Sequence, residues 1–192
     1  MTICFRRMEW VIKTDQEKEL PKRKSTRLKG FDYSSVGAYF VTICIRDRMN
    51  ILSETVKTDL TVTDKTNGLA VGEGLAPPEI TVKLKPCGEI VKEQLQLIET
   101  RFPSVTIEDY VIMPDHIHAV IFLHEKATLD DVICAFESLT SRSCKQKYGV
   151  VKMFQRSSAE HIVRDREDYE TRRKYIYENP IRWYYKYLNT EK

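Results

Sequence analysis

The sequence predicts an α+β protein with helices on one face of an antiparallel, ferredoxin-like sheet. Short runs rich in β-branched and aromatic residues have the length and composition of strands, and two longer segments repeat apolar residues at helical spacings of three and four. Strands separate these segments in the order β, α, β, β, α, β, α. The chain of 192 residues is 42% hydrophobic, which is enough for one packed domain.

The first half of the chain predicts one strand, one loop and one helix. The alternating run at 38–46 predicts the strand, and the apolar positions of 87–102 predict the helix. Residues 53–80 are rich in Thr, Gly and Asp and end in Gly and Pro, which predicts a mobile insertion loop. We expect residues 1–21 to form a flexible N-terminal extension and 22–192 to form a single domain.

The second half begins with two apolar runs, 105–113 and 115–123, that predict adjacent strands. Apolar residues at helical spacing then predict a helix over 128–147. Thr128 is its expected N-cap, and Gly149 is expected to end it.

The C-terminal part predicts a short strand followed by a helix. The run at 150–155 is apolar and β-branched, which predicts the strand. Helical character resumes over 165–178, and Pro180 is expected to interrupt it.

Composition excludes several classes of protein. No segment approaches the ~20 consecutive apolar residues of a membrane span, and the first residues lack an apolar signal segment, so we expect a cytoplasmic protein. The five cysteines are spread along the chain without a Cys-x-x-Cys pair. This spacing indicates neither a disulfide framework nor a thiolate zinc site.

Charge is divided along the chain. Residues 1–48 carry 11 Lys and Arg against 6 Asp and Glu, residues 49–141 carry 7 against 15, and residues 142–192 carry 13 against 7. The two basic ends are candidates for contacts with nucleic-acid phosphates, with nearby Tyr and Trp rings as stacking surfaces for bases. Solvated helix faces are the alternative. The candidate DNA-binding residues are Lys22, Arg23, Lys24, Arg27, Lys29, Arg172, Arg173 and Arg182.

Two histidines, His116 and His118, lie two positions apart in an apolar strand. Residues at i and i+2 of a strand share one face, so both imidazoles can reach one point, as metal ligands do. A pair of hydrogen-bonded core histidines is the alternative. Near the C-terminus, Tyr175 and Asn179 have helical i, i+4 spacing, which places a phenol and an amide on a common face.

Four blocks of this sequence resemble the single-tyrosine HUH transposases, in particular the REP-associated tyrosine transposases of bacteria. They are RKSTRLKGFDYSSVGAYFVTIC, YVIMPDHIHAVIFL, EHIVRDREDY and YIYENPIRW, in the order and approximate spacing of that family. The resemblance implies the HUH endonuclease fold. It also implies that His116, His118 and Asn179 bind Mg²⁺ or Mn²⁺, that Tyr175 is the nucleophile, and that His161 lies behind the metal ligands.

The activity implied by the resemblance is cutting and rejoining of single-stranded DNA beside palindromic hairpins. The nucleophile would form a 5′-phosphotyrosine and release a 3′-hydroxyl that can reverse the reaction. Two alternatives remain from the sequence: a palindrome-binding regulatory or architectural protein with weak catalysis, and a metal-dependent phosphoesterase that uses water. We expect a nucleoid-associated protein, with a monomer favoured over a dimer that shares sites.

Overall fold

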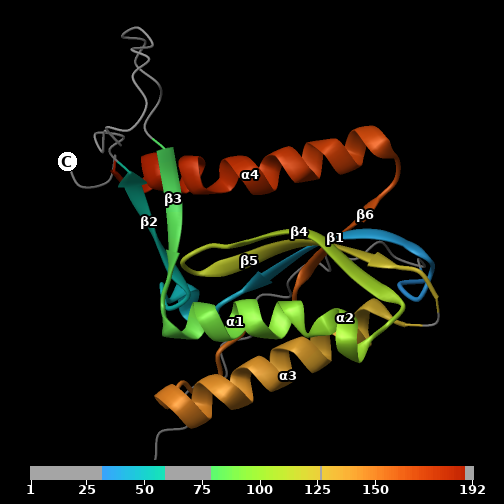
Figure 1. Ribbon diagram of the computed structural model, residues 1–192, viewed down its shortest axis with the longest axis horizontal. Helices are drawn as coiled ribbons and strands as arrows, with labels where there is room; N and C mark the ends of the chain where they lie inside the picture. The colour runs from blue at the N-terminus through green and yellow to red at the C-terminus, as the bar shows by residue number, and fades with distance from the viewer. Residues whose placement is uncertain (1–31, 59–78, 126, 189–192) are drawn as a thin grey trace, which may run out of the picture.

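A four-stranded antiparallel sheet forms the centre of the protein (Figure 1). The computed structural model describes residues 32–58, 79–125 and 127–188. The strand order is β4-β5-β1-β6, with helices connecting β1 to β4 and β5 to β6, which is the ferredoxin-like arrangement. The predicted α+β class and antiparallel sheet are therefore confirmed. The strands are β1 (Gly37–Cys44), β4 (Val105–Ile112), β5 (His116–Leu123) and β6 (Ala159–Val163).

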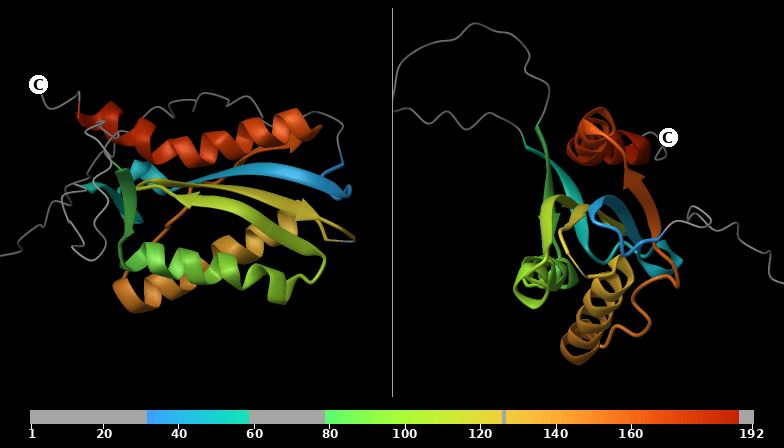
Figure 2. Two further views of the ribbon diagram at one scale, coloured as in Figure 1. Left: turned by 45° about the horizontal axis from the view of Figure 1, so that its top comes forward. Right: turned by 90° about the vertical axis from the view of Figure 1, so that its right-hand side faces the viewer.

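Helices cover both faces of this sheet (Figures 1 and 2). One face is covered by α1 (Pro86–Gln96), the short α2 (Ile98–Arg101) and α3 (Leu129–Tyr148), as predicted. The long C-terminal helix α4 (Arg166–Leu188) lies on the opposite face, which departs from the prediction of helices on one face. It does so because that face also presents apolar side chains, Phe40 and Val120, which Ile176 of α4 buries.

Alternation along the two central strands divides the core between these faces. In β5, Ile117, Ala119 and Ile121 belong to the large cluster shared with α1 and α3. His116, His118 and Val120 therefore face α4. Because helices cover both of its faces, β5 is buried along nearly its whole length, which explains its almost continuous apolar sequence.

The predicted ends of α3 are confirmed. The Thr128 hydroxyl accepts a hydrogen bond from the Asp131 amide at 3.1 Å, as an N-cap does. Gly149 has φ of 70°, in the left-handed region that favours glycine, and its amide donates to the Lys145 carbonyl.

The predicted loop at 53–80 is wrong at both of its ends. Residues Ser53–Thr58 form β2 and Glu79–Leu84 form β3, which pair as an antiparallel hairpin beside the C-terminal end of α4 (Figure 1). These two segments, SETVKT and EITVKL, contain β-branched residues that favour strands, and the Gly and Pro residues lie between them. Residues 59–78 of that expected loop, and the expected extension at 1–21, lie outside the described residues.

The connection from β3 into α1 passes close to the segment before β2. A Cβ atom on Gly88 would lie 2.0 Å from the Leu52 carbonyl oxygen, so only glycine fits at this position. The same carbonyl accepts a hydrogen bond from the Lys85 amide at 2.9 Å. These contacts fix the start of α1 against the sheet.

Two further predictions at the C-terminal end are corrected. The strand expected at 150–155 forms at Ala159–Val163 instead, because Lys152 adopts a left-handed φ of 56° and only Phe154 bridges to Ile45. Helix α4 continues through Pro180 to Leu188, since proline removes only one helical hydrogen bond and aromatic contacts hold the following turns. Within the described ranges, no helix combines the length and apolarity that a membrane span requires.

Candidate active site

The two histidines of β5 lie together beneath α4. Their ring centroids are 4.6 Å apart, and their residues are only 8% and 4% exposed for His116 and His118. The i, i+2 spacing predicted this shared face. The structure adds what the sequence could not show, namely the partner of each ring.

Each histidine uses its Nδ1 atom to bind a neighbour. His116 Nδ1 lies 2.5 Å from Asp115 Oδ1, and His118 Nδ1 lies 2.9 Å from Thr42 Oγ1. An ionised carboxylate can only accept, so His116 Nδ1 donates, and in the neutral ring the lone pair is then on Nε2. Thr42 stands directly opposite His118 in the β1–β5 register.

His118 Nε2 is a buried nitrogen that has no hydrogen-bond partner among the described residues. Burial, together with the positive charges of His116 and Arg48, lowers the pKa of His118 to about 3, against an opposing effect of Asp115. The ring is therefore neutral at physiological pH, which is the form that binds a metal ion.

The donor set fits a divalent cation. Both Nδ1 atoms are bound by neighbours, which leaves the Nε2 atoms as ligands, and a carboxylate behind one ring is the usual partner of a metal-binding histidine. In the described part of the chain, no group of three or more His, Cys, Asp or Glu side chains is placed to hold a metal. Further ligands would therefore be an amide, a phenol, water or substrate.

Tyr175 of α4 lies against the same histidines. Its ring centroid is 5.1 Å from that of His118 and 5.9 Å from that of Phe40, which itself stacks on His118 at 5.2 Å. The residue is 37% exposed, so solvent reaches part of this ring. The Arg182 guanidinium lies over it at 5.7 Å.

Asn179 lies one helical turn beyond Tyr175 and is 6% exposed. One turn further, the ring of Trp183 is 5.5 Å from the ring of His116. Residues at i, i+4 and i+8 share a helix face, so Asn179 stands between two side chains that contact the histidine pair. The structure thus brings four predicted site residues together: His116, His118, Tyr175 and Asn179.

His161 lies on β6, one strand further from the histidine pair. Its Nε2 atom is 2.7 Å from Asp168 Oδ2, and the Arg172 guanidinium binds the other oxygen of that carboxylate at 3.1 Å. The strand register places His161 opposite Phe40. It therefore connects β6 to the start of α4, and Phe40 of β1 lies opposite it in the register and stacks on His118.

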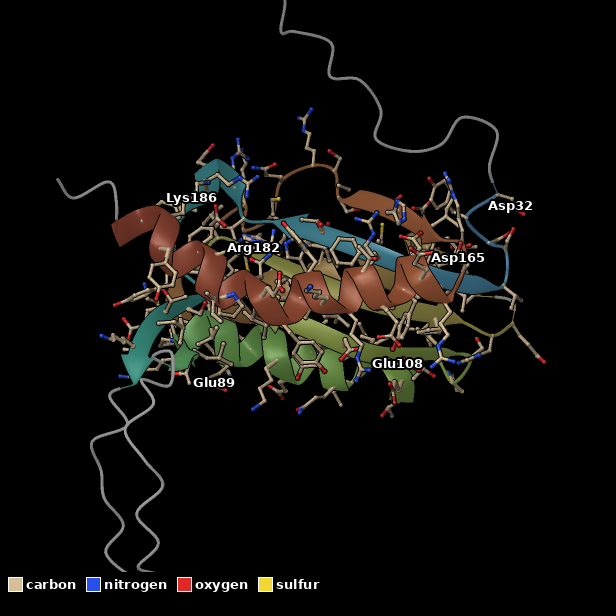
Figure 3. The ribbon with its side chains drawn as sticks, turned by 90° about the horizontal axis from the view of Figure 1, so that it is seen from above. Asp32, Glu89, Glu108, Asp165, Arg182 and Lys186 are labelled. Carbon is tan, nitrogen blue, oxygen red and sulfur yellow. The ribbon has the colours of Figure 1, made fainter. Side chains whose placement is uncertain are left out.

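The predicted DNA-binding residues have different surroundings. Arg172 packs over the Phe40 ring, and Arg173 binds Asp109 of β4 at 3.2 Å, so both help to attach α4 to the sheet. Arg182 pairs with Glu178 within α4 and keeps 62% of its side chain exposed beside Tyr175, toward the C-terminal half of the helix (Figure 3). The predicted cluster of Lys22, Arg23, Lys24, Arg27 and Lys29 lies outside the described residues.

Sequence reasoning missed three residues of this site: Thr42, Asp115 and Phe40. Asp115 carried a signal, because an acid directly before a candidate metal-binding histidine is a candidate partner for its ring. Thr42 and Phe40 carried none, since their place beside His118 depends on the register between β1 and β5.

Comparisons with known proteins identify the family and support the fold. The family model described as "Transposase IS200 like" matches residues 82–179. An uncharacterized protein of Haemophilus influenzae is 25% identical over 183 residues, covering 84% of this chain and 89% of its own. A REP-associated tyrosine transposase, solved bound to a REP hairpin, shares the fold with a TM-score of 0.53 and 18% identity, covering 81% of this chain and 74% of that one. The match of the family model, which spans more than half of the chain and includes both histidines and Tyr175, shows that the protein belongs to the IS200-like transposase family.

Proposed function

We propose that this transposase cuts and rejoins single-stranded DNA beside a hairpin, with Tyr175 as nucleophile and a divalent metal ion, Mg²⁺ or Mn²⁺, as cofactor. The single observation that carries the proposal is the meeting of two distant parts of the chain, where the Tyr175 ring lies 5.1 Å from the ring of His118. The REP-associated transposase of the same fold was solved with a REP hairpin, which supports a hairpin as the substrate.

His116, His118 and Asn179 would hold the cation. When bound, such an ion polarises a phosphate and stabilises the charge that develops on it during displacement. The Nδ1 contacts of Asp115 and Thr42 keep the two rings in place for this role. Burial under α4 keeps His118 neutral and available.

Tyr175 would attack the phosphorus atom of one phosphodiester. The new bond joins the phenolic oxygen to phosphorus, and the bond to the 3′-oxygen of the departing strand breaks. The phenolic proton is transferred to that leaving oxygen by way of solvent, which gives a 5′-phosphotyrosine and a free 3′-hydroxyl. Attack by a 3′-hydroxyl reverses the step, so joining needs no nucleotide cofactor.

The exposed Arg182 is placed to bind the phosphate that Tyr175 attacks. Its guanidinium lies over the Tyr175 ring, and a fixed positive charge at this position would stabilise the additional negative charge of the transition state. The exposed rings of Tyr185 and Tyr187 continue along the same end of α4 and offer stacking surfaces for unpaired bases.

The test is formation of a covalent adduct with a labelled hairpin that carries a single-stranded flank, in Mn²⁺ and in EDTA. We expect an adduct with the wild type in Mn²⁺ only, and none with Tyr175→Phe. Tyr148→Phe is the matched control, because Tyr148 is an exposed phenol at the end of α3, on the face of the sheet opposite α4. An adduct with Tyr175→Phe would assign the nucleophile elsewhere, and hairpin binding without any adduct would indicate a regulatory binding protein.

A further inference from the structure

We propose that Asp115 and Thr42 are positioning residues that orient the rings of His116 and His118, so that both present Nε2 to the cation. This inference rests on the proposed function and assigns roles to two residues that do not contact the substrate or the metal. It also predicts that Asp115, which is charged, has a larger effect on metal binding than Thr42, which is neutral.

Asp115 is held on both its backbone and its side chain. Its carbonyl accepts a hydrogen bond from the Ile45 amide at 2.8 Å, which fixes this residue to the end of β1. Its side chain is only 6% exposed, and a carboxylate buried to that degree must be paired to be tolerated. One oxygen binds His116 Nδ1, and the other lies 3.3 Å from the guanidinium of Arg48.

Both oxygens of Asp115 are therefore engaged by side chains of the protein, which distinguishes it from a residue that binds the cation directly. A carboxylate oxygen at this position accepts a hydrogen bond from the ring nitrogen that faces it, so it favours a proton on His116 Nδ1.

Arg48 reaches Asp115 because of an unusual turn after β1. Asp47 and Arg48 have φ values of 55° and 54°, both in the left-handed region that residues other than glycine rarely adopt. This turn directs the Arg48 side chain back toward the site, while the Asp47 side chain stays 79% exposed. Strain of this kind persists where the surrounding contacts impose it.

Thr42 holds the second ring by a weaker contact. Its hydroxyl lies 2.9 Å from His118 Nδ1, and the antiparallel register places it directly across from that residue. A hydroxyl carries no net charge, so it orients the ring without increasing its basicity as a carboxylate does. Loss of Asp115 should therefore weaken metal binding more than loss of Thr42.

The experiment measures Mn²⁺ affinity of the full chain by electron paramagnetic resonance, without DNA. Loss of a residue behind a metal ligand weakens binding by roughly 10- to 100-fold, which is the range expected for Asp115→Asn. Thr42→Val should weaken it by about fivefold, as for one neutral hydrogen bond. Asp47→Asn is the matched control, because it removes the same charge three residues after the end of β1 but at an exposed position, and it should bind like the wild type.

A second readout separates orientation from general stability. In the metal-free protein, ¹⁵N nuclear magnetic resonance should show His116 with its proton on Nδ1 in the wild type, and a mixture of tautomers in Asp115→Ala. Thermal unfolding of each metal-free variant checks the fold, and Asp115→Asn preserves the shape of the side chain if the alanine variant unfolds. A purely structural role would lower the unfolding temperature and leave Mn²⁺ affinity of the folded protein unchanged.

The outcomes distinguish this inference from the proposed function. If His116→Ala binds Mn²⁺ as well as the wild type, the metal site itself is wrong, and the positioning roles fail with it. If His116→Ala loses Mn²⁺ but Asp115→Asn binds like the Asp47→Asn control, the metal site stands and the role of Asp115 is refuted. Weaker Mn²⁺ binding in Asp115→Asn, together with the tautomer change, supports the inference.

Discussion

At the residue scale, the site shows how burial and hydrogen bonding select one form of an ionisable group. His118 is buried beside a second imidazole, so charging it is unfavourable, and Thr42 satisfies one of its nitrogens. The other nitrogen has no partner among the described residues. An unpaired buried nitrogen is costly in a purely structural histidine, and this favours ligand binding over the alternative of a hydrogen-bonded core pair.

Glu137 of α3 provides a residue-scale prediction on the opposite side of the sheet. Burial and the charge of Glu160 raise the pKa of Glu137 to about 7. The folded state holds the proton of Glu137 more tightly than the unfolded state does. The stabilisation of the fold by this proton is therefore complete below pH 4.5 and is lost as the pH rises to about 7.

We therefore expect Glu137→Gln to increase stability at pH 8 and to change it little at pH 4.5. The gain is about 1 kcal/mol, since partial exposure reduces the full effect of the shift, and it corresponds to an increase of about 2–4 °C in the unfolding temperature. Thermal unfolding at the two pH values measures it. An equal change in stability at the two pH values would show that the surroundings of Glu137 do not raise its pKa.

At the element scale, α4 is attached to the sheet by a small apolar contact and a set of polar ones. Among the described residues, the apolar cluster under α4 contains three buried ones: Phe40, Val120 and Ile176. Asp109 of β4 accepts hydrogen bonds from the hydroxyl of Tyr177 at 2.8 Å and of Tyr169 at 3.4 Å, and it pairs with Arg173. The Tyr169 hydroxyl is shared with Glu108, the residue before Asp109 in β4.

Asp109→Ala should therefore loosen α4 while the rest of the domain stays folded. Partly exposed bonds to a carboxylate of this kind contribute about 1–2 kcal/mol together, and their loss should increase amide hydrogen exchange in α4 and slow adduct formation at Tyr175. Glu170→Ala is the control, because Glu170 is an exposed carboxylate of the same helix. Faster exchange spread equally over α3 would contradict a local role for Asp109.

At the scale of the whole molecule, the expected partner is a polyanion and the chain concentrates its positive charge at its two ends. Three other lysines belong to helices that cover the opposite face of the sheet from α4 and the candidate site. They are Lys92 on α1 and Lys145 and Lys147 on α3. Affinity for DNA should therefore depend on the candidate DNA-binding residues named from the sequence and not on these three lysines.

The prediction concerns the salt dependence of hairpin binding. Replacing Lys22, Arg23 and Lys24 by Gln should reduce the slope of log affinity against log salt by about 2–3, as expected for the loss of about three phosphate contacts. The triple variant of Lys92, Lys145 and Lys147 to Gln has the same change in charge and should keep the wild-type slope. Equal slopes for both triple variants would reject a specific role for the N-terminal cluster.

Much of this architecture was predictable because it depends on neighbours within a few residues. The i, i+2 spacing of His116 and His118 fixes their common face in a strand, and the cap at Thr128 and the stop at Gly149 act within one helical turn. The strand expected at 150–155 and the helix end expected at Pro180 were wrong. Both predictions used local propensity alone, and packing against distant parts of the chain overrides it there.

The sequence by itself determined the fold class, most helices and strands, and the residue types of the site, because periodicity and capping are local properties. Only the tertiary structure decided that α4 crosses the face opposite α1 and α3, that Thr42 stands across from His118, and that the Tyr175 ring packs against the same imidazole. These contacts join residues more than fifty positions apart. They depend on strand register and on which apolar surfaces remain to be covered, and only the folded chain sets both.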